Sequence, residues 1–167
     1  MKYYWYYEFP VGTLGIGEDG EGISNIFIPG TVETGDASRQ ETPLLMEAAR
    51  QLEKYFSGCR REFQLPLSLK GTGFRRKVWE KLCEIPYGES RSYSELAAAV
   101  GNPRACRAVG MANHDNPVMV VVPCHRVLGK DASLTGYAGG LEMKKALLDL
   151  EKIPYRDPAA AYHKERK

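Results

Sequence analysis

The sequence predicts a small α/β domain followed by a mainly helical domain. From Thr72 the hydrophobic pattern changes to helices. The length of 167 residues leaves room for two small domains, each with a modest core. Residues 1–69 carry 6 Lys and Arg against 10 Asp and Glu, whereas residues 70–130 carry 10 against 5. We therefore expect domains at 1–70 and 71–153, with any polyanion bound by the second.

The first domain is expected to open as a sheet. Aromatic residues crowd positions 3–9, and two further apolar segments flank a turn-rich stretch of glycines and acids. These patterns predict two or three antiparallel strands. A helix follows with Thr42 as N-cap and Pro43 as its first residue, and it ends at Gly58. Residues 63–69 are expected to add another strand.

The second domain is expected to consist of helices joined by short turns. Apolar residues recur at helical spacing over residues 74–85. Ser92 is expected to cap a short helix over residues 93–100, and a helix capped by Asn102 is expected to run from Pro103 to about residue 113. Two helices joined by a tight glycine turn have the outline of a helix-turn-helix. Helical hairpins that bind no nucleic acid share that outline.

The helix predicted from Pro103 has two different faces. Ala105, Val109 and Ala112 lie on the side expected to be buried. The other side combines arginines with small residues, which suits close approach to nucleic acid because bulky side chains would hold the helix away. The DNA-binding candidates on that side are Arg104, Arg107, Ala108, Gly110 and Met111. A solvated face on an ordinary helix is the alternative interpretation.

The candidate nucleophile is Cys124. The apolar run at residues 118–122 predicts a buried strand that delivers this thiol to its tip. His125 and Arg126 follow at once, and their positive potential favours the reactive thiolate. Adjacent side chains of an extended chain point to opposite sides, so a bend or a bridging water is needed to connect thiol and histidine. A last helix is predicted from the apolar stripe of Met143, Ala146, Leu147 and Leu150. Glu151, at the edge of that stripe, is a candidate for orienting the histidine, with a surface carboxylate as the alternative.

The remaining cysteines and the histidines show no pattern typical of a metal site. Cys59, Cys83 and Cys106 are expected to be reduced thiols that act as small apolar residues of a core. The chain has no CxxC pair and only three scattered histidines, so we expect no metal and no cofactor. No apolar run reaches about 18 residues, which predicts a soluble cytoplasmic protein, or a nuclear one in a eukaryote, with no membrane contact.

An ordered set of motifs resembles the O6-alkylguanine-DNA alkyltransferases, also called methylated-DNA–protein-cysteine methyltransferases. At its centre is Pro-Cys-His-Arg-Val at residues 123–127, and the resemblance covers residues 71–152. The other motifs are Gly71-Thr72-Gly73-Phe74, Ile85-Pro86-Tyr87-Gly88, Ser92-Tyr93, Gly101-Asn102-Pro103, Arg107-Ala108-Val109-Gly110, Asn116-Pro117 and Gly136-Tyr137-Ala138-Gly139-Gly140. The first 70 residues resemble the family only in architecture. The resemblance implies a ribonuclease-H-like first domain and a winged helix-turn-helix second domain.

The resemblance also implies a chemistry. The family flips an alkylated guanine out of duplex DNA through the minor groove and moves the alkyl group from O6 to a cysteine sulfur, once per molecule. By motif match, Cys124 is the nucleophile, His125 is the base acting through water, and Glu151 orients the histidine. Asn116 helps to order the same network, and Tyr93 matches the donor tyrosine.

The same match implies the partner and the base pocket. Arg107 matches the arginine that fills the space left in the base stack, and Tyr93 also contributes to DNA binding. The residues expected to line the pocket are Tyr137, Val127, Ala138 and Pro123. The implied partner is double-stranded DNA containing O6-alkylguanine, bound by a monomer. Residues 154–167 are expected to form a flexible tail.

Two alternatives each keep part of this interpretation. A helix-turn-helix protein without transfer activity would recognise damaged bases and leave them unrepaired, as relatives that lack the cysteine do. A Cys-His hydrolase would keep the thiol and turn over through a covalent acyl intermediate, but it leaves the Arg107 helix unexplained. Because Cys124 stands beside His125, we favour direct alkyl transfer.

Overall fold

The computed structural model describes residues 1–159, which form two compact units. The first unit contains residues 1–76 and also residues 116–122. The second contains residues 77–115 and, within the described chain, residues 123–159. The first boundary thus falls after residue 76, where residue 70 was predicted, and a later segment returns to the first unit.

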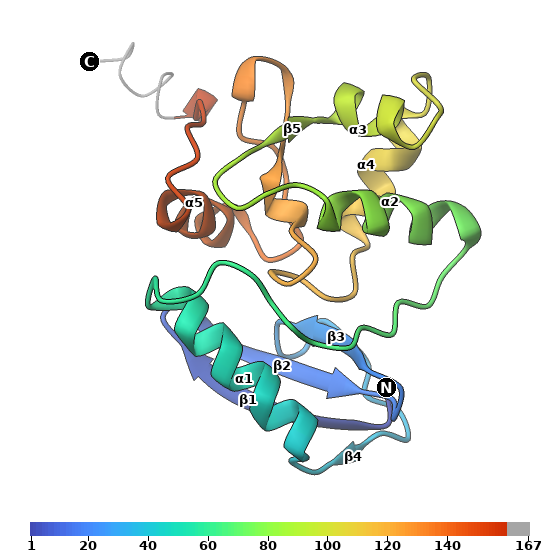
Figure 1. The fold of residues 1–167 in the computed structure, drawn as a ribbon, viewed down its shortest axis with the longest axis vertical. Helices are drawn as coiled ribbons and strands as arrows, with labels where there is room; N and C mark the ends of the chain where they lie inside the picture. Colours follow the sequence, from blue (N-terminus) through green and yellow to red (C-terminus); the bar gives the residue numbers. More distant parts are fainter. Residues whose placement is uncertain (160–167) are drawn as a thin grey trace. The chain divides into compact units, whose positions relative to one another are not determined.

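The first unit contains a four-stranded sheet packed against one helix (Figure 1). The strand order is β3-β2-β1-β4, with antiparallel pairing among the first three strands and parallel pairing of β4 with β1. Thr42 caps α1 by accepting a hydrogen bond from the backbone N–H of Leu45, as the sequence predicts. The elements are β1 (Tyr3–Phe9), β2 (Gly12–Glu18), β3 (Ile23–Phe27), β4 (Ser38–Arg39) and α1 (Pro43–Phe56).

The core of the first unit forms between α1 and the sheet. Apolar side chains three or four residues apart on α1 face apolar residues of β2 and β3, so the helix and the sheet meet in one apolar layer. The side chains in that layer that are at most 1% exposed are Leu14, Ile16, Ile23, Ile26, Leu45, Ala48, Leu52 and Tyr55.

The strand predicted over residues 63–69 is wrong. Within this segment only Leu67 forms a bridge, to Ile23, and no ladder extends from it. The physical reason is Pro66, which has no N–H to donate and whose carbonyl accepts from the N–H of Ile23.

The strand predicted over residues 118–122 is also wrong. Val118 makes one isolated bridge, to Ile26, and the chain then turns. Val120 has a φ of 71°, a left-handed conformation that no extended strand contains. The segment is apolar because it packs into the first unit, and it leads into Cys124 as a turn.

The second unit is mainly helical and contains one short parallel sheet, β5 beside β6 (Figure 1). Ser92 caps α3 in a reciprocal capping box with Glu95, which confirms the predicted start of that helix. Its elements, with α2 crossing the unit boundary, are α2 (Gly73–Cys83), β5 (Arg91–Ser92), α3 (Tyr93–Ala99), α4 (Cys106–His114), η1 (Cys124–Arg126), β6 (Val127–Leu128), η2 (Lys130–Ala132) and α5 (Leu141–Leu150).

The predicted start of α4 is wrong. The helix begins at Cys106, and Asn102 does not cap it. Asn102 belongs to the end of α3, because its N–H bonds to the carbonyl of Ala97 while the N–H of Gly101 bonds to Ala98. This pair of bonds, with Gly101 at a φ of 86°, is a Schellman C-cap.

The segment predicted as a tail makes backbone hydrogen bonds near its start. In residues 154–159, the N–H of Arg156 donates to the carbonyl of Ala132, and its own carbonyl accepts from Leu134. Through Arg156 this part of the chain contacts the loop before α5, and the flexibility of residues 154–167 stays a prediction. Residues 160–167 lie outside the described residues.

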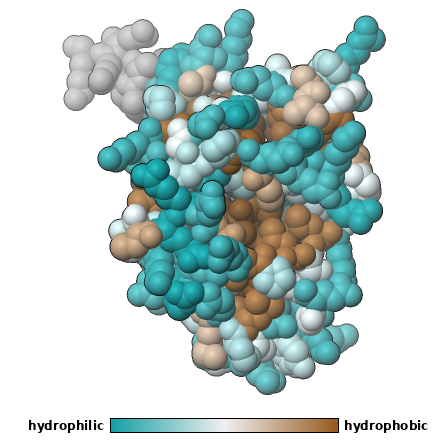
Figure 2. Space-filling model, viewed as in Figure 1, coloured by the Kyte–Doolittle hydropathy of each residue, from teal (hydrophilic) through white to brown (hydrophobic). Residues whose placement is uncertain are grey.

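The surface corrects one further expectation. Cys59 and Cys83 are exposed and Cys106 is half-buried, so these thiols are not core residues. Figure 2 shows hydrophilic residues over much of one face, with hydrophobic patches between them. In residues 1–159 no helix is long and apolar enough to cross a membrane. Within the described residues, the large apolar side chains that are exposed are Met46, Met111 and Leu141.

Candidate active site

The turn η1 provides the bend that the sequence requires at the thiol. Its residues Cys124, His125 and Arg126 are 2%, 0% and 6% exposed, so a one-turn 3₁₀ helix buries all three side chains. The N–H of Arg126 bonds to the carbonyl of Pro123 and closes the turn. Asn113, on α4, donates from its side-chain amide to the carbonyl of Cys124 at 3.4 Å.

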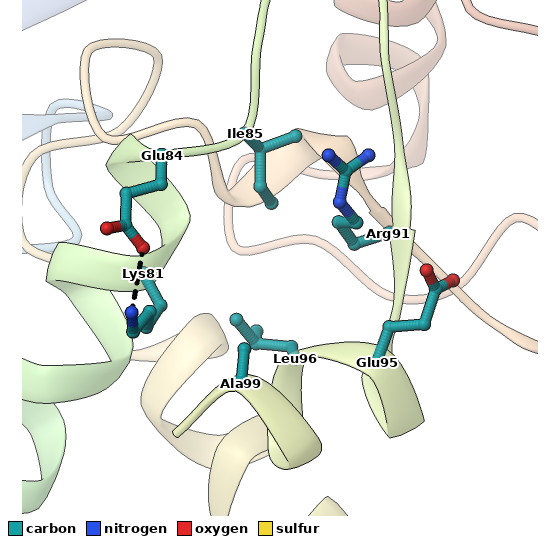
Figure 3. A pocket seen from close by; sticks show the side chains of 7 residues that line it. All are labelled: Lys81, Glu84, Ile85, Arg91, Glu95, Leu96 and Ala99. Carbon is teal, nitrogen blue, oxygen red and sulfur yellow. Dashed lines mark ion pairs between the residues drawn. The ribbon is translucent and has the colours of Figure 1, made fainter. Parts of the chain in front are cut away.

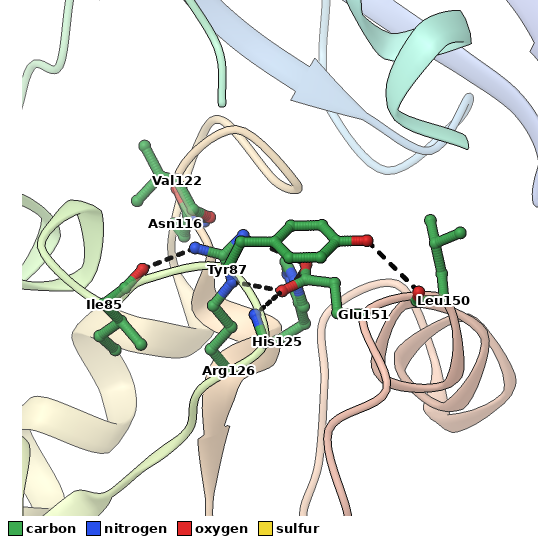
Figure 4. Close-up of polar contacts among 9 residues, drawn as sticks. Ile85, Tyr87, Asn116, Val122, His125, Arg126, Leu150 and Glu151 are labelled. Atoms are coloured by element: carbon green, nitrogen blue, oxygen red, sulfur yellow. Dashed lines mark hydrogen bonds and ion pairs between the residues drawn. The ribbon is translucent and has the colours of Figure 1, made fainter. Parts of the chain in front are cut away.

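A buried histidine and carboxylate lie next to this thiol in the chain (Figure 4). His125 Nε2 is 2.6 Å from Glu151 Oε2, and both side chains are 0% exposed. Because a carboxylate only accepts, Nε2 carries the hydrogen and Nδ1 keeps a lone pair. Among the described residues Nδ1 is buried without a hydrogen-bond partner. Burial lowers the pKa of His125 although Glu151 opposes it, so the ring is a neutral base.

Arg126 holds that carboxylate in place. Its Nε donates to Glu151 Oε1 at 2.8 Å and its Nη2 donates to Oε2 at 3.2 Å. The remaining Nη1 donates to the carbonyl of Ile85 at 2.6 Å, and the guanidinium lies 5.8 Å from the ring centre of Tyr87. The N–H of Gly88 also donates to Glu151 Oε1 at 3.2 Å. The segment 85–88 therefore completes a buried, hydrogen-bonded ion pair.

Lys144 is a site residue that the sequence-based prediction missed. It is 0% exposed, and its ammonium donates to Val127 O at 2.8 Å, Thr135 O at 3.3 Å and Thr135 Oγ1 at 3.2 Å. Desolvation lowers its pKa to about 8, and the charge of Cys124 opposes that shift. By the same attraction the ammonium favours the thiolate. The available signal was a lysine inside the buried stripe of α5, which contains Met143, Lys144, Leu147 and Leu148.

Two predicted network residues make different contacts. The hydroxyl of Tyr93, at the start of α3, lies 3.0 Å from Thr135 Oγ1. Asn116 belongs to the first unit, where its amide donates to Val122 O at 2.8 Å and its carbonyl oxygen accepts from the N–H of Val118 at 3.0 Å. Asn116 therefore fixes the backbone that leads into the cysteine.

The predicted base-pocket residues differ in exposure. Val127 and Pro123 are buried and Tyr137 is 8% exposed, whereas Ala138 is exposed. A Cβ at Gly139 would lie 2.9 Å from the ring of Tyr137, so only glycine lets this ring take its position.

The predicted DNA-binding face of α4 is solvent-accessible. Val109 and Ala112 are buried, and Trp79 anchors the helix by donating from Nε1 to the carbonyl of Ala112 at 2.8 Å. A hollow of about 410 Å³ lies along the opposite side, lined by Arg107, Gly110, Met111, His114 and Asp115. The predicted candidates on that side, exposed except for the half-buried Gly110, are Arg104, Arg107, Ala108, Gly110 and Met111.

A second pocket, of about 300 Å³, lies among α2, β5 and α3 (Figure 3). Leu96 and Ala99 give it an apolar floor, and Lys81 and Glu84 form an ion pair of 3.1 Å at its edge. Its lining includes no residue that the sequence predicts for the site. Among residues 1–159, no group of three or more His, Cys, Asp or Glu is placed to hold a metal ion.

Comparison with known proteins finds relatives along the whole described chain. The family model for the 6-O-methylguanine DNA methyltransferase ribonuclease-like domain matches residues 2–69, and the model for the DNA-binding domain of the same family matches residues 73–153. The constitutive methylated-DNA–protein-cysteine methyltransferase of Bacillus subtilis is 49% identical over 166 residues, covering 94% of this chain and 99% of the relative. The corresponding Haemophilus influenzae protein is 44% identical, with coverage of 98% and 94%.

Solved structures give the same result for the fold. The crystal structure of Mycobacterium tuberculosis OGT in complex with DNA matches with a TM-score of 0.85 and 42% identity, covering 90% of this chain and 92% of that one. An O6-methylguanine DNA methyltransferase from Methanococcus jannaschii matches with a TM-score of 0.65 and 26% identity, covering 90% and 95%. Both confirm the predicted succession of an α/β domain and a helical domain.

Proposed function

Because this chain belongs to the 6-O-methylguanine DNA methyltransferase family, we propose that it flips O6-alkylguanine out of duplex DNA and transfers the alkyl group irreversibly to Cys124. Membership gives the chain the shared activity, which is methyl transfer from DNA to a protein cysteine. One observation supports the roles proposed for individual residues: the buried 2.6 Å bond between His125 Nε2 and Glu151 Oε2. This bond leaves Nδ1 as a basic nitrogen on the residue that follows Cys124.

The transfer is a direct displacement. His125 Nδ1 takes the thiol proton through a bridging water, and Glu151 stabilises the imidazolium that forms. The sulfur of Cys124 attacks the alkyl carbon, so a carbon–sulfur bond forms as the carbon–oxygen bond breaks and its electron pair stays on guanine. A hydrogen bond from Tyr93 stabilises the departing base, which finally gains the proton that the thiol lost. Asn116 keeps the chain entering Cys124 in place for this geometry.

The buried position of the thiol supports base flipping. Cys124 is 2% exposed, so a base inside the duplex stack cannot reach it, whereas an extruded nucleotide can. Arg107 on the exposed side of α4 fills the gap left in the stack, while Ala108 and Gly110 allow a close approach to the minor groove. The product is a thioether, which water does not hydrolyse, so each molecule reacts once. A monomer in the cytoplasm stays our prediction for the acting species.

Mass spectrometry tests the proposal. The protein is incubated with excess duplex DNA that carries one O6-methylguanine, and intact mass and peptides are measured. We expect one added methyl group per molecule, on the peptide that contains Cys124. Cys59→Ala, which removes an exposed thiol of the first unit, is expected to react normally, and Cys124→Ala is expected to bind DNA without gaining mass.

Two results would overturn the proposal. DNA binding by the unmodified sequence with no change in protein mass or lesion would leave damage recognition without repair. Repeated turnover on an ester or amide substrate would indicate a Cys-His hydrolase.

A further inference from the structure

We propose that Thr135 is a positioning residue that directs the hydroxyl hydrogen of Tyr93 toward the flipped base, an inference that rests on the proposed function. Neither the sequence motifs nor the family comparison assigns Thr135 a role. It lies in the loop before α5, between the tyrosine and the buried lysine of the site. Its Oγ1 is 3.0 Å from Tyr93 Oη and 3.2 Å from Lys144 Nζ.

The direction of the bonds from Lys144 follows from the donors present. An ammonium group has three hydrogens and no acceptor, and Lys144 points them at Val127 O, Thr135 O and Thr135 Oγ1. Thr135 Oγ1 therefore accepts from the lysine. Accepting from a charged donor polarises the threonine hydroxyl and makes its own hydrogen a better donor. In our proposal that hydrogen goes to Tyr93 Oη, 3.0 Å away, and the Tyr93 hydrogen is left for the substrate.

Loss of the charge on Lys144 reverses the direction of these hydrogen bonds. A neutral amine has a lone pair and can accept the hydrogen of the Thr135 hydroxyl. Thr135 Oγ1 then accepts from Tyr93, and the tyrosine hydrogen turns away from the base. Desolvation lowers the pKa of Lys144 to about 8, which places this reversal within reach of a pH titration.

Other titratable groups also act on this lysine. Cys124 on η1 stabilises the ammonium when the thiol is ionised, and His125 on the same turn interacts with the lysine charge. Tyr93 faces it from α3 through Thr135. Because several groups contribute, a pH profile of the unmodified sequence alone does not isolate Thr135. A comparison of variants does.

The shape of the loop fixes the direction of the threonine side chain. A Cβ at Gly129 would lie 2.8 Å from Thr135 Cγ2, so the methyl group occupies the space that glycine leaves. A β-branched side chain has few χ1 rotamers, and a held methyl group fixes the hydroxyl as well. Valine at this position keeps the methyl contact and removes only the hydroxyl.

The test measures single-turnover transfer rates with saturating duplex DNA containing O6-methylguanine, from pH 6.5 to 10. Thr135→Val is expected to lower the rate about tenfold at neutral pH, the value of one hydrogen bond, and to flatten the alkaline limb. Thr135→Ser keeps the hydroxyl and is expected to recover most of the rate. Thr135→Ser and Thr135→Ala form a second matched pair, because both lack the methyl group and only the first keeps the hydroxyl. Their comparison replaces that with Thr135→Val if the latter folds poorly.

A double-mutant cycle with Tyr93→Phe separates positioning from a general structural role. In the phenylalanine background Thr135→Val is expected to change the rate less than about twofold, because no tyrosine hydrogen remains to direct. Equal losses in both backgrounds, or a Thr135→Val rate equal to that of the unmodified sequence, would overturn the inference. Absence of transfer by the unmodified sequence would instead overturn the proposed function, so the two failures are distinguishable.

Discussion

Two regions of the second unit are built in opposite ways. The cluster of His125, Arg126 and Glu151 is buried, and hydrogen bonds of 2.6 to 3.2 Å join both carboxylate oxygens of Glu151 to the other two side chains. The outer side of α4 exposes Arg107 and leaves Met111 65% exposed. The side chains of the first region bind one another within the protein, whereas those of the second are exposed to solvent.

Because of this difference, substitutions in the two regions are expected to affect different properties. Removal of one member of a buried ion pair leaves a charge without compensation, so folding and chemistry suffer together. An exposed arginine loses little intramolecular energy when it is replaced, so its loss falls on binding alone. The four predictions below test whether the two regions divide in this way.

Glu151→Gln is expected to have the largest effect. The change removes the charge that Arg126 and His125 contact, which destabilises the fold by about 3 kcal/mol and slows transfer at least about 100-fold. Urea unfolding and single-turnover transfer measure the two effects. Glu142→Gln is the matched control, since that side chain is 93% exposed on the same helix. Normal transfer by Glu151→Gln would refute the role given to the buried pair.

Arg107→Ala is expected to impair the interaction with DNA and to leave the stability of the fold unchanged. The transfer rate at limiting DNA should fall about tenfold or more because the extruded base is no longer replaced in the stack. The free energy of unfolding should change by less than about 0.5 kcal/mol. Arg107→Lys is expected to restore little, since a lysine lacks the planar group that stacks. Equal activity of the lysine and arginine forms would show that charge alone matters.

The stability of the buried cluster is expected to fall in acid. Burial places the pKa of His125 below its usual 6.5, so the unfolded chain binds a proton more readily than the folded chain. The stability present above pH 6.5 is then lost as pH falls, by up to about 1.4 kcal/mol per pH unit. Thermal unfolding between pH 5 and 7 checks this, with His125→Gln as a control that should lose that dependence. An unchanged slope in the control would assign the acid sensitivity to other groups.

Gly110→Ala is expected to give the smallest effect and opposite signs in the two measurements. The added Cβ would lie 3.8 Å from the ring of Tyr93, an ordinary contact, so the helix gains about 0.5–1 kcal/mol of stability. On the proposed DNA-binding face the same methyl group is expected to weaken binding about twofold. Unfolding midpoints and fluorescence anisotropy with duplex DNA measure the pair of effects. Unchanged affinity would remove Gly110 from the DNA-binding face.

Local chemistry allowed parts of the fold to be predicted from the sequence. Thr42 followed by Pro43, and Ser92 followed by Glu95, place helix starts through hydrogen bonds that span three residues. The start of α4 was mispredicted because Asn102, a good N-cap by type, closes the preceding helix. Residue type alone does not distinguish those two uses.

The site was only partly predictable for a similar reason. Cys124, His125 and the candidate Glu151 are recognisable because neighbouring positions and a motif identify them. The contacts of Lys144 and Thr135 join residues that are not neighbours in the chain. A lysine in an apolar stripe does not indicate which group it will contact. The apolar run at residues 118–122 led to a wrong prediction of a strand, because this segment packs as a turn.

The sequence by itself determined the starts of α1 and α3, the antiparallel strands at the start of the chain and the thiol with its histidine, since each depends on residues close together in the chain. The tertiary structure alone decided which nitrogen of His125 faces Glu151, that Arg126 clamps the same carboxylate, and that a lysine is buried near Cys124. The physical reason is desolvation. A buried charge is tolerated only where distant segments supply its partners, and only folding brings those segments together.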